Sequence, residues 1–126
     1  MKALLFVAIG GCCGALARWG LSSWIDQHRG ATAFPLGIFA ANILGCLMFG
    51  LLFGLGERSH WLSDQLRLLI FTGFLGSFTT FSTFSWNTME LLKNGQFGIA
   101  LLNIGASVLV ALAAVWAGYS LTLLPK

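Results

Sequence analysis

The chain has 126 residues, of which 57% are hydrophobic and only 9% charged, with a mean hydropathy of +0.85 and a formal net charge of +3. A soluble domain carries about 25% charged residues, so a chain this short and apolar cannot cover a surface that faces water. The composition therefore excludes a disordered chain and a soluble globular domain, and it predicts an integral membrane protein. The basic residues are dispersed, which argues against a nucleic-acid-binding surface.

Four apolar segments follow one another along the chain. They cover about residues 3–24, 36–56, 66–92 and 97–124. A helix needs roughly 20 residues to cross a hydrocarbon layer about 30 Å thick, and each segment meets that length. The connections are short, so consecutive helices are expected to be antiparallel neighbours. The prediction is one all-α domain over residues 1–126 that crosses the cell membrane (plasma or inner membrane) four times.

Small residues recur at helical spacing in three of these segments. Gly10 and Gly14 lie four residues apart in the first segment, and Gly37, Ala41 and Gly45 have the same spacing in the second. The fourth segment carries Ala106, Val110, Ala113, Ala114 and Ala117. Small residues let membrane helices approach closely. Four short helices cannot enclose much of a pathway, so we interpret these faces as contacts between copies of the chain. Packing within one chain is the alternative interpretation.

The basic residues favour neither orientation in the membrane. One side would hold Lys2, Arg58, Arg67 and Lys126, and the other Arg29 and Lys93, with Arg18 just inside the first segment. Cytoplasmic loops normally carry an excess of Lys and Arg. Because these two sets are nearly equal, we hypothesise that the chain inserts in both orientations and forms an antiparallel homodimer.

The third segment contains the sequence GFLGSFTTFSTFSW, residues 73–86. Gly73 and Gly76 weaken a helix, and the hydroxyls of the residues that follow compete for backbone hydrogen bonds. We therefore expect the third helix to be broken near the bilayer midplane, at residues 76–79. Such a break is tolerated only inside protein or beside a cavity. If two breaks meet in an antiparallel dimer, their carbonyl oxygens would suit a small, hard cation held as structure.

Phenylalanines alternate with hydroxyl residues after this expected break. Phe78, Phe81 and Phe84 are spaced three apart. An aromatic ring has a positive edge that can meet an anion, while hydroxyl groups can replace part of the lost hydration shell. The pattern favours a path for a small anion. In the alternative interpretation the rings face lipid and the hydroxyls bond to carbonyls one turn earlier.

Few other polar side chains fall within the apolar segments. Asn42 lies in the second, Asn103 and Ser107 share one face of the fourth, and Arg18 lies toward one end of the first. Polar residues at membrane depth mark functional sites by default. In the alternative interpretation the asparagines join helices and the arginine reaches the headgroups. The three cysteines are interpreted as packing residues. Asp, Glu and His fall at segment ends or in loops, which disfavours proton relays, side-chain metal sites and enzymatic catalysis.

The stretches GFLGSFTTFSTFS, GGCCGALARW and PLGIFAANILG together resemble the CrcB-type fluoride channels, also called Fluc, and the resemblance extends over the whole chain. It implies an antiparallel dual-topology homodimer with two parallel fluoride pathways. It also implies passive, electrogenic export of fluoride that lowers the cytoplasmic fluoride concentration.

The same resemblance implies roles for particular residues. Structural Na⁺ at the dimer interface would be bound by backbone carbonyls of Gly76 and Thr79. The fluoride pathway would be lined by Asn42, Phe81, Phe84, Ser82, Thr83, Ser107 and Asn103, and Arg18 would draw anions into a vestibule. The chain departs from the family pattern at Asn87, where members often carry Glu, and near Asn103, where some carry Tyr.

Two other functions remain as alternatives. A small multidrug-type antiporter shares the size and span count, but it needs a membrane-embedded glutamate in its first span, and LLFVAIGGCCGALARW has none. The other alternative is a membrane assembly subunit that transports nothing.

Overall fold

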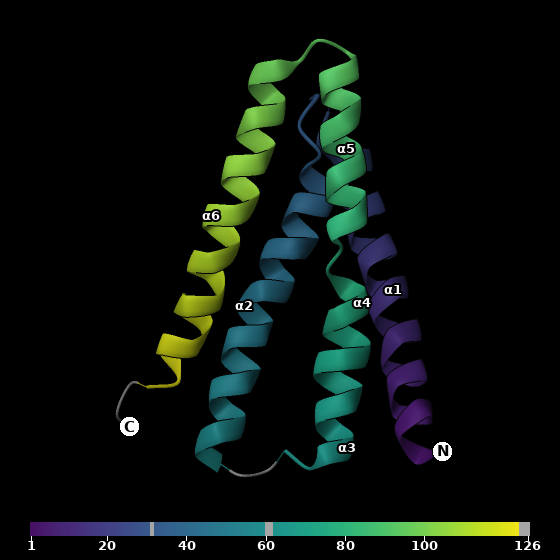
Figure 1. Cartoon of the computed structure of the whole chain (residues 1–126), viewed down its shortest axis with the longest axis vertical. Coiled ribbons are helices and arrows are strands. Elements are labelled where there is room, and N and C mark those ends of the chain that lie inside the picture. The colour runs from purple at the N-terminus through teal and green to yellow at the C-terminus, as the bar shows by residue number, and fades with distance from the viewer. Residues whose placement is uncertain (31, 60–61, 124–126) are drawn as a thin grey trace.

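The computed structural model describes residues 1–30, 32–59 and 62–123, and every regular element within these ranges is a helix (Figure 1). The elements are α1 (Lys2–His28), α2 (Leu36–Ser59), α3 (Asp64–Arg67), η1 (Leu68–Leu75), α4 (Gly76–Phe78), α5 (Phe81–Lys93) and α6 (Phe97–Leu121). Four stretches are long and apolar enough to cross a membrane: α1, α2, the stretch from Asp64 to Lys93, and α6. The prediction of four spans is confirmed. Lys126 and residue 124, the predicted end of the fourth span, lie outside the described ranges.

The helices run up and down, so that the N-terminus, the end of α2 and the end of α6 lie at one end of the molecule (Figure 1). Helices α1 and α2 continue past the apolar runs that predicted them, to His28 and Ser59. Helical hydrogen bonding does not depend on hydropathy, and the Arg29 N–H still bonds to the Ile25 carbonyl at 2.9 Å. Hydropathy therefore located the spans but underestimated the length of these two helices.

The third span is interrupted at Thr79 and Thr80, between α4 and α5. Both residues are extended, with φ, ψ of −86°, 152° and −147°, 121°. The break was expected at residues 76–79, but the helix continues through Phe78, and the Thr79 N–H still bonds to the Leu75 carbonyl at 3.1 Å. The predicted range overlaps the observed break at Thr79, but it begins three residues too early and ends one residue too soon. The π-helix η1, which precedes the break, was not predicted.

Gly73 does not break the helix because it is part of a close contact between α1 and η1. Its Cα lies against the backbone of Gly10, and a methyl group at Gly10 would overlap the Leu69 carbonyl oxygen. A methyl group at Gly14 would likewise overlap the Phe74 carbonyl. Tertiary packing decides the role of these glycines, and it overrides their low helix propensity.

The small residues of the first two spans therefore pack within one chain. Gly10, Gly14, Gly37, Ala41 and Gly45 are all buried against other helices of the same chain. The interpretation of these positions as contacts between copies is wrong. On α6 the buried contact is made by Gly118, which lies against the α2 backbone. The predicted face from Ala106 to Ala117 remains at least partly exposed.

A single chain encloses only a small core and leaves a large apolar surface. Helix α6 packs chiefly against α2, while α1 packs against η1 and α4. Between these two groups, Phe71 lies edge-on to Phe49 and Phe53, with ring centroids 4.9 and 5.9 Å apart. Phe49 and Phe53 are exposed. These three rings, the phenylalanine cluster, line open pockets along α2.

Gly14→Ala is expected to lower the thermal stability of the protein, whereas Gly20→Ala on the same helix is not. Alanine gains about 1 kcal/mol in helix propensity over glycine, but at Gly14 the added methyl group meets only backbone atoms of Phe74, which cannot rotate away. Overpacking of this kind costs about 1–3 kcal/mol. Gly20 has open space around it. Thermal unfolding in detergent tests the pair, and equal melting temperatures would contradict the described α1–η1 contact.

Candidate functional site

Asn42 satisfies the backbone of the broken third span. Its Oδ1 accepts a hydrogen bond from the Thr80 N–H at 2.8 Å, and its Nδ2 donates to the Thr80 carbonyl at 3.2 Å. Thr80 is buried. Unpaired backbone groups at such a position would be costly, so this pairing stabilises the break. A primary amide carries two N–H donors, and one donor of Asn42 remains for another partner.

Thr80 also caps α5 through its side chain. Its Oγ1 accepts from the Thr83 N–H at 3.2 Å and donates to Thr83 Oγ1 at 3.1 Å, with Ser82 Oγ 3.3 Å away. The predicted pathway hydroxyls Ser82 and Thr83 therefore lie around this cap. The sequence signal for the cap was available, because threonine before a helical segment is a favoured N-cap residue.

A pocket of about 350 Å³, here called the central pocket, lies beside the break. It brings together five of the predicted site residues: Asn42, Thr79, Phe81, Phe84 and Ser107. The lining that was not predicted is Cys46, Thr80, Val108, Ala111 and Leu112. Apolar walls with a few convergent polar groups are typical of binding sites for small species. None of the described residues that line this pocket has a charged side chain.

The two phenylalanines of the central pocket lie next to each other on successive turns of α5. Their ring centroids are 5.5 Å apart and the rings are tilted by 42°. Phe84 is partly buried, whereas Phe81 is 79% exposed in the single chain. The Phe81 ring can therefore contact lipid or another protein chain on this face.

Asn103 lies behind the central pocket and does not line it. Its side chain is only 1% exposed, its Nδ2 donates to Thr88 Oγ1 at 2.9 Å, and its Oδ1 accepts from Ser107 Oγ at 3.4 Å. Thr88 in turn donates to the Phe84 carbonyl at 2.8 Å. Thr88 was not predicted. Its sequence signal is weak, since a single threonine in an amphipathic stretch does not reveal a partner on another helix.

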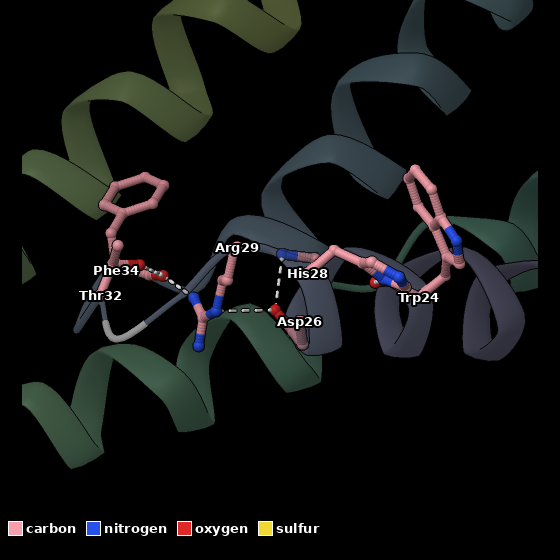
Figure 2. Close-up of polar contacts among 7 residues, drawn as sticks. Trp24, Asp26, His28, Arg29, Thr32 and Phe34 are labelled. Atoms are coloured by element: carbon pink, nitrogen blue, oxygen red, sulfur yellow. Dashed lines mark hydrogen bonds and ion pairs between the residues drawn. The ribbon is translucent and has the colours of Figure 1, made fainter.

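A second, polar pocket of about 310 Å³ lies at the end of α5 near the connection to α6 and is here called the terminal pocket. Its polar lining is Asp26, Arg29, Asn87, Glu90, Asn94 and Gln96. Figure 2 shows how the connection between α1 and α2 is held there. Arg29 Nε lies 3.2 Å from Asp26 Oδ1, the Gly37 N–H donates to that same oxygen at 3.1 Å, and Arg29 also donates to the Phe34 carbonyl.

The two pockets have no lining residue in common, but α2 and α5 contribute residues to both. On α2, Ile38 lines the terminal pocket and Asn42, four residues later, lines the central pocket. On α5, Phe84 lines the central pocket and Asn87, three residues later, lines the terminal pocket. Residues three or four apart lie on the same helix face. The pockets therefore follow each other along the same faces of α2 and α5.

Comparison with known proteins identifies the family. The family model described as "CrcB-like protein, Camphor Resistance (CrcB)" matches residues 5–119. The chain belongs to the CrcB family. The resemblance inferred from the sequence motifs is thus confirmed. Membership of this family, together with four candidate spans, makes the chain a multi-pass membrane protein.

Several similar proteins in the CrcB family carry the name "Fluoride-specific ion channel FluC". The protein from Maridesulfovibrio salexigens is 44% identical over 121 residues, covering 96% of this chain and 95% of the relative. The one from Methylobacillus flagellatus is 41% identical over 121 residues, covering 96% and 94%. "Fluoride-specific ion channel FluC 2" from Symbiobacterium thermophilum is 47% identical over 112 residues, covering 89% and 90%.

Arg18 lies apart from both pockets of this CrcB family member. It is partly buried on α1 and lines neither the central nor the terminal pocket. Across the described ranges it makes no hydrogen bond or ion pair, so its charge is uncompensated by the chain itself. Its role in a vestibule stays a prediction.

Gly76 and Thr79 offer backbone oxygens that fit a hard cation. In a continuous helix the Thr80 N–H would bond to the Gly76 carbonyl, but here it donates to Asn42 instead. Thr79 is extended, so its carbonyl leaves the helical pattern. Residues 1–30, 32–59 and 62–123 contain no cluster of three or more His, Cys, Asp or Glu. The two carbonyl oxygens are the candidate ligands, and two from one chain are too few for a complete coordination shell.

Proposed function

We propose that this CrcB family member is a fluoride-specific ion channel that lets fluoride leave the cytoplasm passively across the plasma membrane. The main support is that this chain is 40–47% identical, over nearly its full length, to relatives named as fluoride-specific ion channels. The pocket beside the break supports the proposal, because its lining suits a small anion.

The central pocket offers donors that replace water around fluoride. The free N–H of Asn42 can supply a hydrogen bond, the Ser107 hydroxyl can supply another once it leaves Asn103 Oδ1, and the edges of Phe81 and Phe84 can supply positive partial charge. The apolar remainder of the lining lowers the local dielectric constant, which strengthens each of these interactions. Within the described residues no carboxylate lines the pocket, so no side chain there carries a negative charge.

The proposed path continues from the central pocket into the terminal pocket along α2 and α5. The Asp26 carboxylate at that end is paired with Arg29, which reduces its repulsion of an approaching anion, whereas the Glu90 carboxylate lines the same pocket and would repel one. Arg18, being uncompensated, would attract anions at its own position on α1. The driving force is the membrane potential, about 2.3 kcal/mol per charge per 100 mV, which favours exit of an anion from a negative interior.

Fluoride efflux from proteoliposomes tests the proposed function. Vesicles loaded with fluoride should release it once valinomycin allows K⁺ to balance the charge, and chloride-loaded vesicles should not release chloride. Absence of fluoride efflux, or equal efflux of chloride, would sink the proposal. Efflux that requires a proton gradient would favour an antiporter, and no transport of either anion would favour a non-transport assembly subunit.

We propose, further, that the working channel is an antiparallel homodimer. The exposed rings of Phe49, Phe53 and Phe81 support a second copy, because they are apolar surfaces that a single chain leaves uncovered. The near balance of basic residues supports insertion in both orientations. A protease-cleavable C-terminal tag should be about half protected in sealed inverted vesicles. Complete protection or complete cleavage would exclude the antiparallel arrangement.

The proposed dimer would bind structural Na⁺ through the carbonyls of Gly76 and Thr79 from both copies. The released Gly76 carbonyl supports this assignment. Bound Na⁺ would hold the two breaks together and stabilise the interface. Replacing Na⁺ by N-methyl-D-glucamine should therefore lower the thermal stability of the dimer. An unchanged melting temperature would show that Na⁺ does not stabilise the dimer.

A further inference from the structure

The chain of hydrogen bonds behind the central pocket has a fixed direction. Thr88 Oγ1 donates its single proton to the Phe84 carbonyl at 2.8 Å, and a carbonyl can only accept. The remaining lone pairs of Thr88 can therefore only accept. Asn103 must present Nδ2 to Thr88, at 2.9 Å, so its Oδ1 faces Ser107. The Ser107 hydroxyl must then donate to that oxygen.

This direction determines what Ser107 can offer to the pocket. Its one proton is committed to Asn103 through a hydrogen bond of 3.4 Å, which is long for a hydroxyl donor. An anion in the central pocket can take over this proton, because a charge-assisted hydrogen bond is stronger than a long neutral one. Asn103 Oδ1 then loses the hydrogen bond that it accepts from Ser107, and regains it when the anion leaves.

We propose that Thr88 is a positioning residue that sets the orientation of Asn103 and thereby makes Asn103 compete with the anion for the Ser107 proton. The inference rests on the proposed function and concerns how tightly the same pocket holds its ion. Conduction needs binding that is favourable enough for entry and weak enough for exit. The competition keeps the site weak, so that the ion is released quickly.

Removing the Thr88 hydroxyl should reverse the orientation of Asn103. With valine at this position, Nδ2 would face methyl groups and lose its hydrogen bond in a site where Asn103 is 1% exposed. A buried N–H without a partner is rarer in proteins than an under-satisfied carbonyl. The amide should therefore turn, donate Nδ2–H to Ser107 and leave the Ser107 proton free for the anion.

The test compares Thr88→Val with Thr88→Ser in fluoride efflux from proteoliposomes over a range of fluoride concentrations. The valine variant should lower the half-saturating fluoride concentration by about fivefold, the factor expected for one neutral hydrogen bond, and should also lower the saturating flux. The serine variant retains the hydroxyl and should restore both values. If the valine variant does not fold, Thr88→Ala removes the same hydroxyl and carries the same expectation.

A Ser107→Ala background completes the test. There the substitution at Thr88 should no longer change the half-saturating concentration, since the proton that it frees is absent. A half-saturating concentration that stays the same or rises in Thr88→Val, or a fall that persists in the Ser107→Ala background, would overturn the inference. Wild-type protein without fluoride efflux would instead overturn the proposed function, so the two failures are distinguishable.

Discussion

Phe84→Ile should lower fluoride flux by about tenfold or more while the protein still folds and assembles. Phe84 lines the central pocket, and in the proposed pathway its ring edge would be one of the few positive groups that an anion meets. Isoleucine fills much of the same space but has no quadrupole. If the ring edge contributes about 1.4 kcal/mol to the proposed fluoride site, its loss corresponds to one factor of ten.

Phe97→Ile is the matched control for this experiment. Phe97 begins α6, is largely exposed and lines neither the central nor the terminal pocket. Its replacement should leave efflux at the wild-type rate. If Phe84→Ile also retained wild-type efflux with a normal elution volume, the Phe84 ring would be a packing residue, as the alternative interpretation of the phenylalanine pattern holds.

Asn42→Ala should be the most destabilising of the substitutions considered, and it should also lower flux strongly. The variant leaves the N–H and the carbonyl of Thr80 without their side-chain partner at a buried break. Each unsatisfied buried group costs about 1–3 kcal/mol. The variant also removes the free N–H that the proposed pathway offers to fluoride. Thermal unfolding in detergent measures the first effect and liposome efflux the second.

Gln65→Ala serves as the control for loss of an amide side chain. Gln65 is exposed on α3 and lines neither pocket, so both its stability and its flux should match the wild type. A melting temperature of Asn42→Ala equal to that of Gln65→Ala would show that Asn42 does not hold the break together.

Hydropathy and length were sufficient to predict the four spans, because the apolar runs are long and are separated by short polar connections. The existence of a break in the third span was also predictable from its unusual density of glycine and hydroxyl residues. Its position was not, because Gly73 is held in η1 by packing against Gly10 on α1. Propensity describes one segment at a time, whereas this outcome depends on the neighbouring helix.

The polar contacts of the site show the same limit. Asn42 was predicted as a functional residue, but its partner Thr80 lies 38 positions away, and no spacing rule connects the two. The Thr88–Asn103 hydrogen bond likewise joins α5 to α6 across 15 positions. Periodicity assigns a polar side chain to a helix face, but only the packing of the helices determines which side chain it meets.

The reversal potential of single-channel or macroscopic currents in planar bilayers shows directly whether the protein conducts fluoride and not chloride. With a tenfold fluoride gradient and symmetric chloride, a fluoride-specific channel should reverse about 59 mV from zero, on the side set by fluoride. Imposing an opposite chloride gradient should leave that value unchanged. A reversal potential that stays at zero in the fluoride gradient, or one that follows chloride, would contradict the account.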